Sequence, residues 1–277
     1  MDSKKEIKNF WDSNPVDGFS ENAHWRVEYR KRKDRWMADN ILSLDYKGCM
    51  LSVGCGQGTD MILALEKMDQ KDTLFGLDIS LDSIKSAVRS IREVGAKKGN
   101  LIVINGDAEK LPFSDATFDI VWSWGVLHHT PDINAALAEI KRVLNRDGKL
   151  YLMLYRRTCP KGMAVRSLRW LSQVIDKITK KESYIYSKMK KSRAGEGHGT
   201  AFYELFGCPI LNLYSYKELK TMLKDFKNLK IESYESGVYQ ELMFLPKPFN
   251  LLIPVIKRLD PPKNPLGFHW IISAEKG

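Results

Sequence analysis

The sequence predicts an α/β protein built on a doubly wound, mostly parallel sheet, and three observations support this prediction. Short apolar runs alternate with helical patterns from about residue 49 to residue 155. The connections between them are short, which is typical of parallel strands whose helices cover both faces of a sheet. The chain has 277 residues, 43% of them hydrophobic and 28% charged, which suits one large globular domain.

Apolar periodicity and capping residues predict the first elements. A strand, a helix and a second strand are expected at residues 49–53, 60–68 and 74–79. Ser80 belongs to the residue types that cap helix N-termini, and Gly95 is typical of a helix end. The sequence therefore predicts a helix over residues 81–94.

The next elements continue the alternation. Strands are expected at residues 101–104, 118–122 and 149–155. Pro131 is expected to open a helix, because the apolar residues that follow it, up to residue 144, share one helical face. Ligands of such sheets bind at the carboxyl ends of strands, where the strand order reverses. The turn after residue 53 and the side chains of Asp78, Asp107 and Ser123 are therefore expected around one crevice.

The alternation is interrupted twice after Tyr155. Residues 156–213 are basic and partly helical, with an amphipathic helix expected over 163–178, and residues 238–266 carry an apolar helix. We interpret both segments as caps over the crevice. The core pattern resumes with Ser215 as an N-cap. A helix and two strands are then expected at residues 216–226, 229–234 and 268–274.

Charge and cysteine content narrow the class of protein. The net charge is +10, and residues 156–193 alone hold twelve basic and two acidic residues, which also gives +10. Such a segment attracts nucleic acid, anionic lipid or an acidic substrate, or is simply a solvated helical face. The four cysteines have no CxxC spacing, and the five histidines complete no zinc pattern. With no secretory signal or membrane span in the sequence, we expect a reduced, cytoplasmic protein without a structural metal.

The stretch LSVGCGQGTD, residues 51–60, places glycines at 54, 56 and 58. A dinucleotide fingerprint needs its third glycine where this chain has Thr59, and no Walker lysine is present. Asp78 lies about 20 residues further on, where a carboxylate can accept both hydroxyls of a ribose. The pattern favours a nucleoside ligand without a pyrophosphate, and S-adenosylmethionine (SAM) satisfies that description. Asp107 would then accept from the adenine, although it is also a suitable turn carboxylate.

Four segments in order resemble the class I SAM-dependent methyltransferases, and most closely the ubiquinone/menaquinone-biosynthesis-type (methyltransferase domain 11-like) subgroup. They are LSVGCGQGTD, GLDIS, GDAEKLPFSDATFDIVWSWGVLHHTPD and LNRDGKLYLMLY. The resemblance implies a Rossmann-like, seven-stranded sheet whose last strand is antiparallel. It also implies one domain, with its core at about 46–155 and 214–277 and with cap elements at 1–45, 156–213 and 238–266.

The resemblance also implies a cofactor site. It assigns the glycine loop to the methionine moiety, the end of the second strand to the ribose, the turn after the third strand to the adenine, and the end of the fourth strand to the sulfonium. The residues concerned are Gly54, Cys55, Gly56, Gly58, Asp78, Ile79, Asp107, Ala108, Ser123 and Trp124. One position departs from the family, which usually has an acid where this chain has Ser52. Asp60 is the nearest carboxylate that could replace it, although a first-turn acid also stabilises a helix N-terminus.

Candidates for the acceptor side are less specific. His128 and His129 follow the fourth strand, where a histidine can take a proton from a hydroxyl or amine, although the pair can also be structural. The basic, aromatic N-terminal arm can shield a sulfonium or simply pack on the sheet. Candidate acceptor contacts are Trp11 and Tyr29 in the arm, and Tyr203 and Tyr214 further along the chain.

The sequence therefore predicts a SAM-dependent methyltransferase that transfers a methyl group to an oxygen or nitrogen of a small, apolar or aromatic molecule. Alternatives are an RNA methyltransferase, a membrane-peripheral enzyme acting on a lipid-like substrate, and a SAM-binding protein without catalysis. The basic segment motivates the first two, but no base-methylation motif is found, which disfavours nucleic acid. Thr59 argues against a dehydrogenase.

Overall fold

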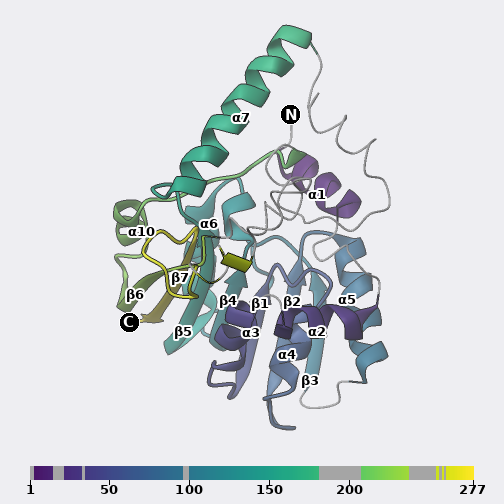
Figure 1. Ribbon diagram of the computed structural model, residues 1–277. Helices are drawn as coiled ribbons and strands as arrows, with labels where there is room; N and C mark the ends of the chain where they lie inside the picture. The colour runs from purple at the N-terminus through teal and green to yellow at the C-terminus, as the bar shows by residue number, and fades with distance from the viewer. Residues whose placement is uncertain are drawn as a thin grey trace.

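A seven-stranded sheet forms the centre of the protein, with the strand order β3-β2-β1-β4-β5-β7-β6 (Figure 1). The computed structural model describes residues 3–14, 22–32, 35–95, 100–180, 207–236, 254–255, 258 and 260–277. The strands are β1 (Cys49–Val53), β2 (Thr73–Asp78), β3 (Asn100–Asn105), β4 (Phe118–Trp124), β5 (Leu144–Tyr155), β6 (Phe226–Tyr234) and β7 (His269–Lys276). Strands β1 to β5 pair in parallel, whereas β7 is antiparallel to both β5 and β6. The expected seven-stranded fold with its antiparallel last strand is confirmed.

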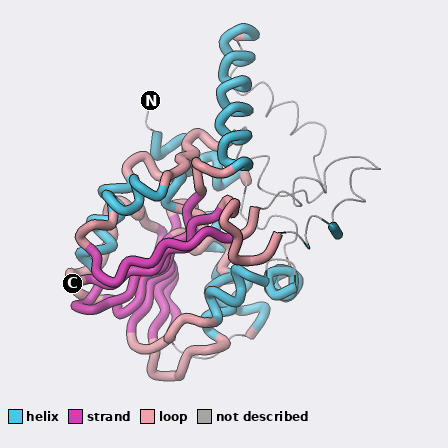
Figure 2. Tube along the Cα trace, turned by 60° about the vertical axis from the view of Figure 1, so that its left-hand side comes forward, coloured by secondary structure: helices cyan, strands magenta, loops and turns pink. Residues whose placement is uncertain are grey.

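Helices cover both faces of the sheet (Figures 1 and 2). They are α1 (Ser3–Ser13), α2 (Ala23–Arg32), α3 (Arg35–Leu42), α4 (Thr59–Leu65), α5 (Leu81–Val94), the 3₁₀ turn η1 (Leu127–His129), α6 (Ile133–Val143), α7 (Pro160–Thr179) and α10 (Tyr216–Met222). Successive residues of β1 point to opposite layers, as strand geometry requires. Leu51 and Val53 join the apolar cluster that includes α6 and α10, whereas Met50 joins the cluster formed with α2, α3, α4 and α5.

Local capping signals located several helices correctly. Ser80 accepts a hydrogen bond from Ser83 N, α5 ends at Val94, and Gly95 takes the left-handed conformation. Ser215 and Glu218 form a reciprocal capping box at the start of α10. These ends agree with the sequence expectation because a cap acts within a few residues of the chain.

Other boundaries differ where a neighbouring group decides the end of an element. The helix after Pro131 begins at Ile133, because the Asp132 carboxylate caps the amides of residues 134 and 135. Helix α10 ends at Met222 and not at residue 226. Phe226 is buried and pairs with Lys276 as the first residue of β6. Strand β5 begins at Leu144, five residues before the expected start. The apolar helix expected near residues 249–259 lies largely outside the described residues.

Within the described ranges, no helix has both the length and the apolar content that crossing a bilayer requires.

Candidate cofactor and acceptor site

The glycine loop after β1 is a tight turn in which all three glycines have positive φ. The φ values are +74° at Gly54, +52° at Gly56 and +82° at Gly58, a region that other L-residues avoid. A Cβ at Gly54 would lie 2.2 Å from Val126 Cγ2, and one at Gly58 would lie 3.2 Å from Ala87 Cα. The loop therefore needs glycine for its own conformation and packing, and the same absence of side chains leaves the main chain accessible to a ligand.

Asp78 lies at the end of β2, directly beside this loop. Its Oδ2 accepts a hydrogen bond from Gly56 N at 2.9 Å, and its Oδ1 accepts one from Ser80 N at 2.9 Å. Burial raises the pKa of the Asp78 carboxyl against the opposing effect of these amides. Each oxygen keeps a second lone pair, so the carboxylate can still accept two hydroxyl donors. Ile79, the next residue, accepts from Asn105 Nδ2 at 2.9 Å through its carbonyl.

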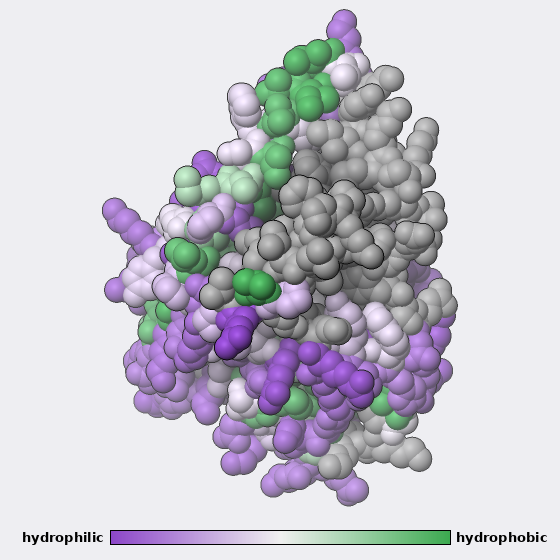
Figure 3. Space-filling view, viewed as in Figure 1, coloured by the Kyte–Doolittle hydropathy of each residue, from purple (hydrophilic) through white to green (hydrophobic). Residues whose placement is uncertain are grey.

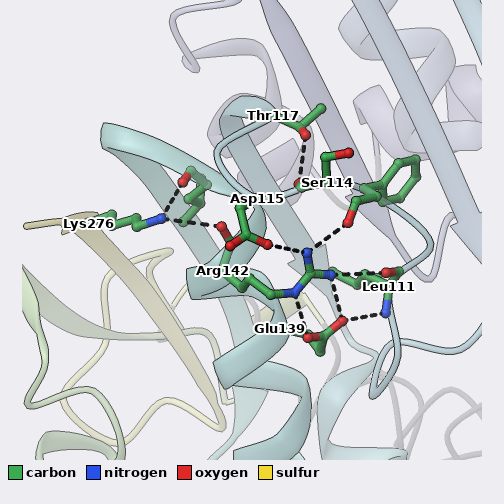
Figure 4. A network of polar contacts seen from close by, with 9 residues as sticks. Leu111, Ser114, Asp115, Thr117, Glu139, Arg142 and Lys276 are labelled. Carbon is green, nitrogen blue, oxygen red and sulfur yellow. Dashed lines mark hydrogen bonds and ion pairs between the residues drawn. The ribbon is translucent and has the colours of Figure 1, made fainter.

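The turn after β3 is held by its own carboxylate and by helix α6. Asp107 Oδ1 accepts from Glu109 N at 2.9 Å, which is the turn role the sequence left open, and Ala108 is buried beside it. Arg142 on α6 binds the Leu111 carbonyl and forms an ion pair with Glu139, whose Oε2 accepts from Leu111 N (Figure 4). These contacts fix the backbone that carries Asp107.

The fourth strand meets the first where the strand order reverses. Ser123 is buried and donates from Oγ to the Val53 carbonyl at 3.0 Å, so the end of β4 is tied to the start of the glycine loop. Ser52 is buried on β1 beside Trp122. Trp124 closes β4, and its Nε1 is buried with no hydrogen-bond partner among the described residues. This edge thus combines apolar surface with one unused donor.

Asp60 and Cys55, the two other polar candidates at this loop, are largely buried. Asp60, in the first turn of α4, lies 3.3 Å from Arg30 Nε on α2, and both side chains are largely buried. The carboxylate suggested as a substitute for the missing acid thus has a cationic partner in this structure. Cys55 is buried, and burial raises the pKa of its thiol well above the usual range.

His128 and His129 are buried in η1, between β4 and the end of β5. His129 Nδ1 lies 2.8 Å from the Ile210 carbonyl oxygen, so Nδ1 carries the proton and Nε2 presents a lone pair. Nε2 has no partner among the described residues. Burial lowers the pKa of His129 to about 4, which keeps the ring neutral at physiological pH. The His128 ring lies 3.9 Å from the ring of Tyr155.

Helix α1 lies across this edge, and sequence reasoning anticipated only its aromatic contribution. The Trp11 ring contacts the His129 ring edge-on, with centroids 5.1 Å apart. At the N-terminal end of the helix, Lys4 Nζ lies 2.5 Å from Asp107 Oδ2. At the other end, Asp12 Oδ1 accepts from Ser80 Oγ at 2.5 Å. No sequence motif marks the lysine or the aspartate, because both contacts join positions far apart in the chain.

The remaining candidates lie in three different places. Tyr29 is on α2, where its ring stacks on Trp25 at 4.9 Å. Tyr214 is buried beside β5, and burial raises its pKa to about 12, so its hydroxyl stays protonated. Tyr203 lies outside the described residues.

His269, at the start of β7, was missed by the sequence reasoning. Its ring lies 5.0 Å from Trp36 and 5.6 Å from Tyr155, and burial lowers its pKa to about 3. Its Nδ1 and Trp36 Nε1 are buried without hydrogen-bond partners in the described part of the chain. Unused buried polar atoms are uncommon in folded proteins, and several of them cluster at this one edge. Strand β7 brings His269 there from residues remote in sequence.

The groups at this edge match the chemistry of S-adenosylmethionine. Asp78 offers acceptors for ribose hydroxyls, the loop offers bare main chain, and the Trp11 ring lies beside the turn that follows β4. Within the described ranges, no three His, Cys, Asp or Glu side chains gather as metal ligands would. An open recess lies at the opposite, amino-terminal edge of the sheet, lined by residues that include Lys47, Asp119 and Arg146.

Comparisons with known proteins identify relatives of this chain. A family model described as a methyltransferase domain matches residues 51–152. A Bacillus subtilis protein named as methyltransferase YrhH is 34% identical over 136 residues, which cover 47% of this chain and 72% of that protein. A demethylmenaquinone methyltransferase of Staphylococcus aureus is 27% identical, with 81% of this chain and 83% of that protein covered.

Two solved structures share the fold. A SAM-dependent methyltransferase of Thermotoga maritima superposes with a TM-score of 0.56 at 16% identity, covering 98% of this chain and 100% of that one. A geranyl diphosphate C-methyltransferase of Streptomyces coelicolor superposes with a TM-score of 0.59 at 14% identity, covering 100% and 99%. At these identities the likeness concerns the fold alone.

Proposed function

This chain belongs to the class I SAM-dependent methyltransferases, and on that premise we propose that it methylates an oxygen or nitrogen of a small, apolar or aromatic molecule. The methyl donor is SAM, and the acceptor is the part that the proposal adds. When bound, SAM supplies a methyl group on a sulfonium, which leaves as a neutral thioether. The protein's tasks are therefore to align the acceptor and to exclude water.

The proposed donor site uses the residues around the glycine loop. Asp78 would accept the ribose hydroxyls with the lone pairs that Gly56 N and Ser80 N leave unused. Gly54, Gly56 and Gly58 would face the methionine part, and the Asp107–Ala108 turn would face the adenine. Ser123 and Trp124, at the end of β4, would flank the sulfonium. The location of these groups at the point where the strand order reverses supports this assignment.

The acceptor proposal rests on where His129 carries its ring proton. Its Nδ1 proton is engaged by the Ile210 carbonyl, so its Nε2 offers a buried lone pair with no other use among the described residues. A hydroxyl or amine of the acceptor would donate to Nε2 and be oriented by it. His129 would then hold the proton as the acceptor atom attacks, because attack by a neutral oxygen or nitrogen leaves one proton to remove.

The surroundings of His129 favour an apolar ring compound. The rings of Trp11, Tyr155 and Phe268 lie in one chain of contacts, with 5.1 Å between Trp11 and His129 and 4.6 Å between Tyr155 and Phe268. Sites lined by aromatic side chains with few polar groups bind apolar ligands. Relatives named as demethylmenaquinone methyltransferases also support a ring-containing acceptor.

A lipid-like acceptor is the second candidate, and helix α7 favours it over RNA. The basic segment that motivated RNA includes α7, yet large apolar side chains of this helix are exposed (Figure 3). An RNA-binding face is built from cations and stacking rings around a phosphate backbone. An exposed aliphatic surface suits a lipid better.

The test measures binding of the donor and transfer of its label separately. Calorimetry with SAM and with NAD examines the cofactor, and binding of NAD without SAM would contradict the donor site. SAM carrying a ¹³C-methyl group is then incubated with phenols, quinols and aromatic amines, and the products are extracted into organic solvent and examined by NMR. The proposal expects an extractable product with its label on oxygen or nitrogen. Label on carbon, or only in added RNA, would refute the proposed acceptor atom or class.

A further inference from the structure

Helix α7 stands away from the body of the protein (Figures 1 and 2). Among the described residues, it packs on the protein through the side that carries Val165 and Ser172, both buried. On the same side, Arg169 donates to the Cys208 carbonyl at 3.2 Å. The part of the helix that packs on the protein is thus its more polar side.

The outward side of α7 is apolar. We call the exposed apolar residues of this helix the α7 stripe: Met163, Leu168, Trp170, Leu171 and Ile178. Trp170 is 66% exposed, Met163 63% and Ile178 76%. Their spacing of seven or eight residues places Met163, Trp170 and Ile178 on one face of the helix. The stripe is seen as a green band along the helix in Figure 3. A surface helix normally buries its apolar face, so this orientation is the reverse of the usual one.

Cations border the stripe. Arg166 and Lys177 are exposed on the same helix, at positions adjacent to Met163 and Trp170 around the helical circumference. The helix contains four basic residues and one acid, Asp176, and its C-cap is Lys180. The composition and placement are those of helices that lie in the interface of an anionic bilayer, with Trp and Leu inserted and Lys or Arg at the phosphates.

We propose that the α7 stripe docks this protein on an anionic membrane surface. Two copies packed through their stripes would bring Arg166 and Lys177 close to like charges, which opposes self-association. Nucleic acid would leave the aliphatic side chains without an apolar partner. A bilayer with anionic headgroups satisfies both the stripe and its cations. The docking concerns the surface of the protein and does not depend on which acceptor is methylated.

The test is co-sedimentation of the full-length protein with vesicles. One set is phosphatidylcholine alone, and the other contains roughly 30% phosphatidylglycerol, a proportion at which basic residues contribute measurably. We expect binding to the anionic vesicles. About 0.5 M NaCl should weaken this binding, because salt screens the attraction between the cations and the anionic headgroups. The Trp170→Gln/Leu171→Gln and Arg166→Ser/Lys177→Ser variants should each lower the partition coefficient about tenfold. The matched control is Leu266→Gln/Lys67→Ser, which changes an exposed leucine and an exposed lysine outside α7.

Four outcomes would overturn the proposal. They are no binding to either vesicle, binding that the α7 variants leave unchanged, a dimer in sedimentation velocity that the Trp170→Gln/Leu171→Gln variant dissociates, and loss of folding in that variant because another segment of the chain covers the stripe. SAM binding by calorimetry accompanies each variant. Intact SAM binding without vesicle binding would refute the docking surface alone and leave the proposed function standing.

Discussion

Lys4 Nζ lies 2.5 Å from Asp107 Oδ2 and so joins the first helix of the chain to the turn after β3. The same lysine lies 2.7 Å from Glu109. Burial alone would lower the pKa of Lys4, but the hydrogen bonds and charges of the two carboxylates raise it. Helix α1 is therefore held over the edge at which the cofactor is proposed to bind, and its contact with Asp107 would compete with the proposed adenine contact.

The first prediction concerns this competition. Lys4→Met should tighten SAM binding by about two- to fivefold, because a partly exposed ion pair of at most about 1 kcal/mol no longer has to be broken. Calorimetry at low salt measures the change. Lys5→Met, which removes an exposed lysine from the same helix, is the control and should leave the dissociation constant unchanged. Weaker binding by Lys4→Met would indicate that the lysine supports the bound state.

The second prediction separates affinity from stability at Asp78. Asp78→Asn should weaken SAM binding at least about tenfold, because an amide offers one acceptor oxygen where the carboxylate offers two. Burial raises the pKa of Asp78, so the native carboxyl holds its proton to a higher pH than the unfolded one. The charge thus lowers stability as pH rises through this range, and removing it should change the unfolding free energy by only about 1 kcal/mol.

Urea unfolding and SAM calorimetry on the same preparation test this pair of effects. Asp82→Asn, an exposed first-turn acid of α5, is the matched control. Unchanged SAM affinity in Asp78→Asn would contradict the ribose assignment.

The parts of this fold that sequence reasoning located are those determined locally. Ser80 and Gly95 delimit α5 by capping and conformational preference, so four or five residues of sequence suffice. The glycine loop is also determined locally, because each of its glycines has a positive φ, which residues with a Cβ rarely adopt. Phe226 shows the opposite case. Its helical pattern is overridden by burial in the sheet and by pairing with Lys276, a contact that local sequence does not reveal.

The candidate site likewise contains residues that local sequence predicts and residues that it does not. The crevice residues were predicted because each lies at or just past the end of a strand, and parallel strands end at one edge. Lys4, Asp12 and His269 were missed because α1 and β7 reach that edge from opposite ends of the chain. The outward stripe of α7 was also missed, since amphipathic periodicity gives the apolar face but not the direction in which it points.

The third prediction concerns the Arg142 clamp, by which we mean the contacts of Arg142 with Glu139 and Leu111 in Figure 4. Arg142→Gln should lower the unfolding free energy by about 1–3 kcal/mol, because it removes charge-assisted hydrogen bonds to Glu139 and to the Leu111 and Phe113 carbonyls. SAM binding should weaken several-fold as well, because these bonds hold the turn that carries Asp107. Chemical denaturation and calorimetry measure the two effects, with the exposed Arg146→Gln as the control. Stability and affinity equal to those of the wild type would show that the clamp is dispensable.

The fourth prediction is a loss of stability in acid. Burial lowers the pKa of His129 to about 4 and that of His269 to about 3, whereas the pKa of an imidazole in the unfolded chain is about 6.5. Between these values the unfolded chain binds protons that the native protein does not, so the unfolding free energy falls as pH falls. Each histidine contributes up to about 1.4 kcal/mol per pH unit.

Urea unfolding at intervals of about half a pH unit, from about pH 7.5 to 4.5, measures how the unfolding free energy changes with pH. His129→Asn should make it shallower, whereas the exposed His24→Gln should not. A slope unaffected by His129→Asn would place the acid sensitivity in other groups.

The last prediction tests His129 in the reaction itself. His129→Gln removes a proton acceptor, so kcat should fall about 10²- to 10⁴-fold while the dissociation constant of SAM stays within about twofold. Because burial lowers the pKa of His129 to about 4, its Nε2 is already unprotonated well below neutral pH. The wild-type rate on an acceptor that does not itself titrate should therefore be flat between about pH 6 and 8, with any loss confined to more acidic conditions. A structural role would instead lower stability and SAM affinity together. A wild-type rate that rises through about pH 6.5 would show that the imidazole titrates as an exposed one does and would contradict the buried, neutral acceptor.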